Sequence, residues 1–290
     1  MKRTKPWELS DEAWERVRPL IPERPAHPKG GRPAQSDRQM LSAILYVLRT
    51  GIQWNALPRE LGASTTVYDR FRLWEEQGVF ERIWQAGLQE YDELEGIAWE
   101  WQSMDGVMTK APFGGAATGA NPTDRGKRGS KRSQLSDGRG MPLALVIAGA
   151  NRHDMKLVEA TLDSIEIERP TPTPEQPQHL CLDAGYDYEM VYETVKAHQY
   201  VPHIRPNQHN RATHARPAQE AEVETSSSLE SMKQPRRWVV ERLHSWINRS
   251  RRLLVRWEKL DSTYQAFLHL ACGLICFQHC DRFLSLQVSE

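Results

Sequence analysis

The sequence predicts an all-helical N-terminal region followed by an α/β core. Up to about residue 95 the apolar residues recur at helical spacing, whereas from about residue 96 short apolar runs of strand length alternate with helical segments. An acidic stretch without Lys or Arg, residues 90–105, marks the junction. A chain of 290 residues is long enough for two domains, which we place at residues 1–95 and 96–290.

The composition is that of a soluble globular protein. Hydrophobic residues make up 39% and charged residues 26%, and no apolar run is long enough to span a membrane. The basic residues 1–7 are not followed by the apolar core of a secretory signal. Cysteines are few, and Cys272, Cys276 and Cys280 lie four residues apart on an apolar segment, which favours packing over zinc binding. We expect a reduced, cytoplasmic protein with no membrane partner.

The first helices are marked by their caps. Ser10 is a candidate N-cap for a helix that includes Trp14 and Val17. A Pro- and Gly-rich linker, residues 21–33, follows. Ser36 can then cap a helix that runs to Thr50 and is closed by Gly51.

A second helix from Ser64 makes residues 36–77 a candidate helix-turn-helix. In that motif the second helix enters the major groove of DNA. The alternative is a helical bundle that only packs on the core. The candidate DNA contacts in this helix are Ser64, Thr65, Thr66, Arg70 and Arg72.

The α/β core is predicted from strand-length apolar runs and turn residues. A strand before Asp105 precedes a polar loop through Arg132, a hairpin turn at residues 136–140 and a strand at 141–148. The later elements are a helix at 153–165, a strand before Asp183, a helix at 189–198, a strand at 200–204 and a flexible insertion at about 205–235.

Asp105 and Asp183 each follow an apolar run, which places both carboxylates at strand ends. Such positions border the crevice where open α/β sheets bind ligands. Taken singly, each Asp is more often a turn former, and Asp187 is an alternative to Asp183. Asp154 is expected to cap the helix that follows it and to play a supporting role.

A third acid, Glu241, lies in a basic amphipathic segment predicted to be a helix. Nine Lys or Arg occur between Lys233 and Lys259 against Glu241 and Glu258, so a phosphate backbone is a natural partner. The alternative is a solvated charged helix with an ion pair between Arg237 and Glu241. Together the three acids suggest divalent-metal phosphoryl chemistry, since two hard cations need shared carboxylate ligands.

Basic residues with interspersed glycines form a second candidate contact with the DNA backbone, because small residues allow close approach. A disordered basic loop is the alternative. The candidates in this loop are Arg125, Lys127, Arg128, Lys131 and Arg132, and those around Glu241 are Arg237, Arg242 and Arg249.

The chain resembles the DDE transposases of bacterial insertion sequences, the group typified by insertion sequence five. The matching elements are Asp105-Gly106, residues 121–132, the motif Asp183-Ala-Gly-Tyr186 and residues 237–242. The resemblance implies an RNase H-like core in which Asp105, Asp183 and Glu241 hold two Mg²⁺ ions, with Mn²⁺ able to substitute. It also implies cleavage of the element's ends, 3′-hydroxyl strand transfer into target DNA, binding of double-stranded DNA at terminal inverted repeats, and a homodimer on DNA in the bacterial nucleoid.

The sequence departs from the wider pattern of these enzymes at two places. Gln234 stands where a Tyr is expected and Asn248 where a Lys is expected, for which Arg249 or Arg251 is a substitute. Neutral Ala116, Ala117 and Ala120 occupy a stretch that often carries charge. The alternatives are therefore a decayed or repurposed DNA-binding protein without catalysis, and a metal-dependent nuclease without strand transfer.

Overall fold

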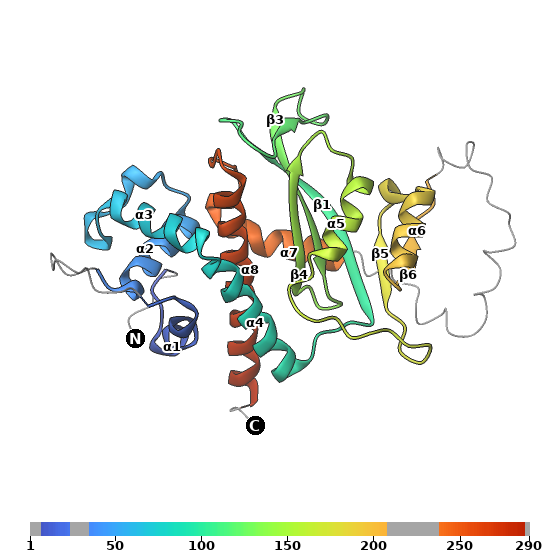
Figure 1. The fold of residues 1–290 in the computed structure, drawn as a ribbon, viewed down its shortest axis with the longest axis horizontal. Coiled ribbons are helices and arrows are strands. Elements are labelled where there is room, and N and C mark those ends of the chain that lie inside the picture. Colours follow the sequence, from blue (N-terminus) through green and yellow to red (C-terminus); the bar gives the residue numbers. More distant parts are fainter. Residues whose placement is uncertain (1–6, 24–34, 208–237, 288–290) are drawn as a thin grey trace, which may run out of the picture.

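The computed structural model describes residues 7–23, 35–207 and 238–287. Figure 1 shows the N-terminal helices on one side, a sheet with its own helices on the other, and the long helices α4 and α8 between them. The predicted insertion at 205–235 falls almost wholly outside the described residues, as does most of the predicted linker at 21–33.

The predicted helix caps of the N-terminal region are confirmed. The Ser10 hydroxyl accepts a hydrogen bond from the Ala13 amide, and the Ser36 hydroxyl accepts one from the Gln39 amide. Gly51 ends its helix in the left-handed conformation, with φ of 73°. The elements are α1 (Asp11–Val17), η1 (Arg18–Leu20), α2 (Asp37–Thr50), η2 (Trp54–Ala56), η3 (Arg59–Leu61), α3 (Ser64–Glu76) and α4 (Val79–Glu95).

The C-terminal helix α8 (Asp261–Gln287) packs along α4 and belongs to the core. The two helices approach closely at glycines. A side chain on Gly87 would meet Cys276, and one on Gly273 would meet Ile83. Cys272, Cys276 and Cys280 are buried free thiols in this helix, as the packing interpretation predicted.

The sheet has the strand order β2-β3-β1-β5-β6, and β4 pairs with β3. β3 is antiparallel to β1 and β4, whereas β5 and β6 run parallel to β1 and to each other. This is the RNase H-like arrangement, three antiparallel strands extended by two parallel ones. The strands are β1 (Trp101–Lys110), β2 (Gly119–Ala120), β3 (Arg128–Ser136), β4 (Pro142–Gly149), β5 (His179–Leu182) and β6 (Val201–Ile204).

Two predictions about these strands are wrong. Asp105 lies in the middle of β1, because the strand continues to Lys110 and pairs with β3 along its length. The predicted polar loop through Arg132 ends earlier, since β3 begins at Arg128. The turn between β3 and β4 is where the sequence predicted it.

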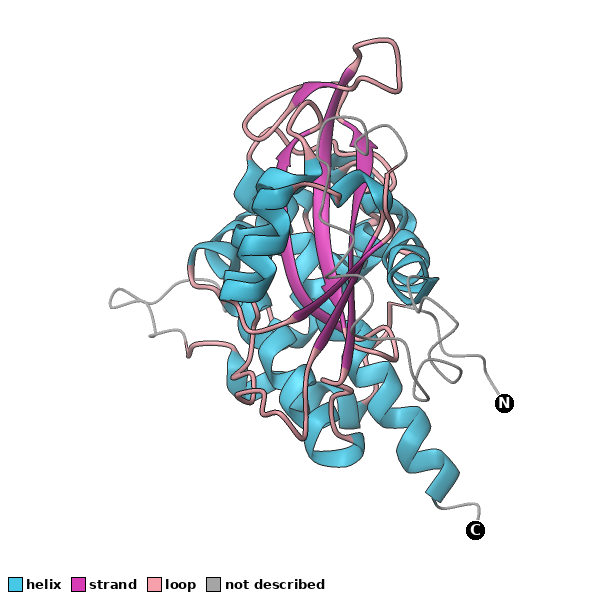
Figure 2. Ribbon diagram, turned by 90° about the vertical axis from the view of Figure 1, so that its right-hand side faces the viewer, coloured by secondary structure: helices cyan, strands magenta, loops and turns pink. Residues whose placement is uncertain are grey.

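Helices cover both faces of the sheet, which is strongly twisted in Figure 2. His153, not Asp154, caps the first of these helices through its Nδ1 atom, and Asp154 instead pairs with Lys131. The elements are η4 (Asp154–Leu157), α5 (Val158–Asp163), η5 (Ala184–Tyr186), α6 (Glu189–Ala197), α7 (Trp238–Asn248) and η8 (Arg251–Leu253). The helix around Glu241 ends at Asn248.

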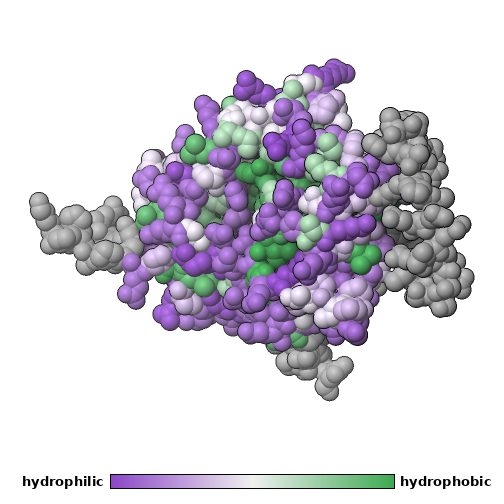
Figure 3. Space-filling model, turned by 45° about the vertical axis from the view of Figure 1, so that its right-hand side comes forward, coloured by the Kyte–Doolittle hydropathy of each residue, from purple (hydrophilic) through white to green (hydrophobic). Residues whose placement is uncertain are grey.

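Within the described ranges, no helix has the length and apolar character needed to cross a membrane. The face drawn in Figure 3 is mostly hydrophilic, and hydrophobic residues gather in a hollow near its middle.

Candidate active site

Asp105 and Asp183 lie side by side on parallel strands. Ser103 on β1 is in register with Cys181 on β5, so each Asp stands two residues beyond a paired residue. Side chains two residues apart point to the same face, and neighbouring strands are about 4.8 Å apart. Asp183 directly follows β5, as predicted, and its Oδ1 accepts a hydrogen bond from the Gly185 amide. Two carboxylates thus meet on one face of the sheet.

Helix α7 covers the same face. Asp105 is in register with Gln134, and Arg132 lies two residues away on that face of β3. The Arg132 Nη2 atom donates a 3.1 Å hydrogen bond to Oδ1 of Asn248 at the end of α7. Glu241 is seven residues before Asn248 and three before His244, which places it on the helix side that faces this sheet surface. The Glu241 side chain itself is exposed.

The three carboxylates do not form a ready metal cage. Among the residues that the structure describes, no three His, Cys, Asp or Glu side chains are close enough to hold one ion. The donor set nevertheless suits a hard divalent cation, because all three side chains offer oxygen.

A buried tyrosine lies behind the aspartates. The Tyr186 side chain is 1% exposed, and its hydroxyl has no hydrogen-bond partner among the described residues. Burial raises the pKa of Tyr186, and the negative charges of Asp154, Asp105 and Asp183 raise it further. The hydroxyl is thus a neutral donor beside three acids.

Asp154 approaches the sheet from the opposite face. Its Oδ1 lies against the backbone of Gly106, where any larger residue would displace it. Its Oδ2 accepts a 2.7 Å hydrogen bond from the buried Lys131 ammonium, which also donates to the Arg152 carbonyl oxygen. The requirement for Gly next to Asp105 therefore comes from packing.

Two families match this chain. The family described as "Transposase DDE domain" matches residues 102–276, more than half of the chain, including β1 and β5 with their aspartates and α7. The chain belongs to the DDE transposases. These enzymes cleave DNA and transfer strands. A second family, described as "Putative transposase of IS4/5 family", matches residues 9–84, which cover most of the helical region of the transposase.

Relatives of the transposase come from insertion elements. A "Putative transposase for insertion sequence element IS402" from Burkholderia cepacia is 34% identical over 174 residues, 59% of this chain and 74% of the relative. An uncharacterized 16.2 kDa protein of the same element is 32% identical over 118 residues, 39% of this chain and 80% of that protein.

Solved structures give a weak likeness. The Mos1 mariner paired end complex with Mn aligns with 88% of this chain and 82% of its own chain at 13% identity and a TM-score of 0.26. A pre-cleavage Mos1 transpososome aligns with a TM-score of 0.26 and 12% identity, over 89% of this chain and 82% of that chain. The fold assignment rests on strand order and the family match, because such TM-scores add nothing to it.

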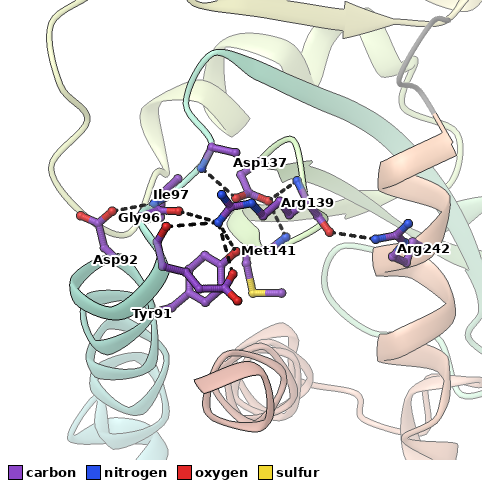
Figure 4. Close-up of polar contacts among 10 residues, drawn as sticks. Tyr91, Asp92, Gly96, Ile97, Asp137, Arg139, Met141 and Arg242 are labelled. Carbon is purple, nitrogen blue, oxygen red and sulfur yellow. Dashed lines mark hydrogen bonds and ion pairs between the residues drawn. The ribbon is translucent and has the colours of Figure 1, made fainter. Parts of the chain in front are cut away.

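The turn between β3 and β4 ties α7 to the helical region of the transposase (Figure 4). The buried Asp137 carboxylate accepts hydrogen bonds from the amides of Ala98, Arg139 and Met141. The Arg139 guanidinium donates to the carbonyl oxygens of Glu95 and Gly96 at the end of α4. The Arg242 Nη1 atom on α7 donates a 3.3 Å hydrogen bond to the carbonyl oxygen of Arg139. The residue after Glu241 is therefore held by the turn that fixes the domain junction, a connection that the sequence did not indicate.

The structure does not support Arg70 as a DNA contact. Its side chain is 5% exposed, pairs with Asp37 of α2 and lies over the Trp74 ring. Arg72 is a quarter exposed and pairs with Glu75 and Glu76 on its own helix. The hydroxyl-bearing Thr65 and Thr66 at the start of α3 are exposed, and Ser64 is half-buried.

The predicted basic loop is divided by burial. Arg125, Lys127 and Arg128 are exposed at the start of β3 and in the turn before it. Lys131 and Arg132, in contrast, are buried in the strand at 5% and 1% exposure. Both side chains are enclosed by the fold and are not available to a DNA backbone.

Arg242 and Arg249 are the predicted cations around Glu241 that the structure describes, and they differ in exposure. Arg242 stacks over the Trp238 ring at 4.4 Å in addition to its bond to Arg139. Arg249 is exposed and close to Arg49 of α2, whose pKa is lowered by burial and by this neighbouring charge. Two neighbouring positive charges favour a bound anion. Sequence patterns could not have identified Arg49, because it lies in a helix far from Arg249 in the chain. Arg237 and Gln234 lie outside the described residues.

Proposed function

We propose that Asp105, Asp183 and Glu241 are the metal-binding carboxylates of this insertion-sequence transposase and that Mg²⁺ is the ion. The observation that carries the proposal is the shared sheet face. Asp105 on β1 and Asp183 directly after β5 each stand two residues beyond the paired Ser103 and Cys181, and Glu241 lies on the helix that covers this face. The chain's own residues supply no nucleophile, and none is needed if water and then a 3′-hydroxyl attack phosphorus.

The proposed metal ions, when bound, would stabilise the attacking and leaving oxygens of an in-line displacement. Asp105 and Asp183 are held by the strands, so they form the fixed part of the site. Glu241 is exposed at the first turn of α7, and we infer that its side chain moves toward the aspartates when cations bind. The Tyr186 hydroxyl would donate a hydrogen bond to one of these acids and keep its orientation.

We further propose that the transposase binds double-stranded DNA at the element's terminal inverted repeats and at the target, as a homodimer in the bacterial cytoplasm. The exposed cations Arg125, Lys127, Arg128 and Arg249, joined by Arg49, would contact phosphates. The helix-turn-helix formed by α2 and α3 would contribute Ser64, Thr65 and Thr66 at the start of its second helix. We propose that residues 1–95 form the DNA-binding domain and residues 96–290 the catalytic domain, with α8 packed along α4.

The test is nicking and joining of a supercoiled plasmid that carries the gene's native flanks, with Mg²⁺ or Mn²⁺. Asp183→Asn should lower metal-dependent cleavage by about a thousandfold, since one ligand of the displacement is lost. Asp163→Asn, an exposed acid on α5, is the matched control and should cleave like the unmodified protein.

Asp187→Asn sharpens the assignment of the second ligand. Asp187 accepts hydrogen bonds from the Tyr192 hydroxyl and the Asn207 amide, so we expect it to have a structural role and to leave cleavage largely intact. Loss of cleavage in Asp187→Asn but not in Asp183→Asn would contradict the proposed site. If the unmodified protein binds DNA without cutting it, the catalytic proposal fails.

A further inference from the structure

A groove of about 650 Å³ lies between the helical region and the core. On one side it is lined by Trp54 of η2 and Tyr68 of α3, and on the other by Phe113 from the loop after β1 and by Trp257 from the segment before α8. A second hollow of about 310 Å³ shares these four aromatic residues.

The aromatic rings of this groove are unusually exposed. Phe113 is 59% exposed, Trp257 39% and Tyr68 37%. The Phe113 and Trp257 rings lie 5.5 Å apart, and Tyr68 packs edge-on to Trp54 at 5.3 Å. Exposed aromatic faces gathered in one concave surface mark a binding site.

The groove wall is rigid. Arg252 lines it but is buried, since its Nε donates a 2.7 Å hydrogen bond to Glu258 and its Nη1 donates one to the Ile52 carbonyl oxygen. This pairing joins the segment before α8 to the residue after Gly51. The groove is therefore preformed by contacts between the two regions.

Polar groups and cations surround the rings. Gln53, Asn55, Ser64 and Thr65 supply amides and hydroxyls along the floor. Three exposed cations belong to residues in or next to the lining. Lys259 lines the second hollow, the Arg251 backbone lies against Gly51 of the groove, and the Arg128 guanidinium lies against Gly114, the residue after Phe113. The rim charge is complementary to a polyanion.

We propose that this groove binds an unpaired stretch of DNA strand. Phe113 and Trp257 would stack on bases, and Arg128, Arg251 and Lys259 would contact the flanking phosphates. Aromatic faces bind unpaired nucleotides without regard to sequence, whereas bases within a duplex already stack on each other. The inference rests on the proposed function, since a transposase must handle DNA whose strands have been separated at a cut.

An apolar peptide is a poorer fit to the same surface. Such an occupant would leave the amides and hydroxyls of the floor without partners and would gain nothing from the three rim cations. A strand of DNA uses both the rings and the rim.

The test is fluorescence anisotropy of a labelled oligothymidine and of a duplex of equal length, in EDTA so that no cleavage occurs. Trp257→Ala should weaken single-strand binding about tenfold and leave duplex binding within about twofold. Trp257→Phe keeps a stacking face and should restore most of the affinity. Met190→Ala, which removes an exposed side chain from α6, is the control and should bind both DNAs like the unmodified protein.

Lys259→Gln gives a second measurement that does not depend on the folding of a tryptophan variant. It should lower the slope of log affinity against log salt for single strands by about 0.7. Asp183→Asn should bind the single strand like the unmodified protein, so a defect in cleavage and a defect in the groove are separable.

Equal single-strand affinity in Trp257→Ala and the unmodified protein would overturn the proposal. A change in the oligomeric state of Trp257→Ala without a change in its single-strand affinity would also overturn the proposal, because the groove would then hold a second copy of the chain.

Discussion

Two buried interfaces of this transposase are built in opposite ways. Between α4 and α8 the contacts are apolar and dense, with Trp84 and Leu88 of one helix and Cys276 of the other fully buried. Between β3 and α7 the buried strand face is polar along its whole length. The residues on that face are Ser130, Arg132, Gln134 and Ser136.

The polar interface is also incompletely paired. Arg132 Nε and Nη1, both polar atoms of the Gln134 side chain and His244 Nε2 have no hydrogen-bond partner among the described residues. A buried polar group left unpaired costs about 1–3 kcal/mol. The interface between α4 and α8 therefore supplies stability. The interface between β3 and α7 loses some of it, at the helix on which we propose that the Glu241 side chain moves.

Trp84→Ala should break the apolar interface. The side chain is fully buried, and its Nε1 donates a 3.0 Å hydrogen bond to the Pro142 carbonyl oxygen at the start of β4. The free energy of unfolding should fall by about 3–5 kcal/mol, measured by chemical denaturation. Trp84→Phe keeps most of the buried ring and should lose less than half as much. A loss below 1 kcal/mol for Trp84→Ala would contradict the assignment of stability to this interface.

Acid should weaken the apolar interface through His269. Burial lowers the pKa of His269 to about 4, below its ordinary value of 6.5. Between pH 6.5 and 4 the unfolded chain binds a proton that the folded protein does not, so stability falls as the pH falls through this window. The loss is about 3 kcal/mol. Urea unfolding at several pH values should show a smaller loss in His269→Gln, and identical pH dependence in both proteins would exclude His269 as the cause.

Local signals account for the parts of the fold that the sequence predicted. The limits of α2 follow from a side-chain cap at Ser36 and a glycine at position 51, both of which act within one turn. The turn between β3 and β4 and the position of Asp183 likewise depend on neighbouring residues.

The errors occur where a distant partner decides the outcome. Arg70 is buried because it pairs with Asp37, which lies 33 residues earlier in the sequence. Lys131 is buried because it pairs with Asp154. The start of β3 was predicted to be a loop because both faces of the strand carry polar residues. One face packs under η4 and α5, and the other face packs under α7. A pattern of alternating polarity cannot reveal a strand whose two faces are both polar.

The smallest effect is expected for Arg132→Met in the polar interface. Replacing a buried, incompletely paired cation by an apolar side chain of similar length is often neutral or stabilising. We expect the free energy of unfolding to change by less than about 1 kcal/mol. The pKa of His244, lowered to about 4 by burial and then by Arg132, should rise but stay below 6.5, which NMR titration can follow.

Arg256→Met is the matched contrast. That equally buried guanidinium donates hydrogen bonds to Ser130 and to the carbonyl oxygens of Glu258 and Ala117. Its replacement should lower the free energy of unfolding by more than about 2 kcal/mol. If Arg132→Met proved as costly as Arg256→Met, the β3 and α7 interface would be a source of stability like the one between α4 and α8, and the contrast between the two would disappear.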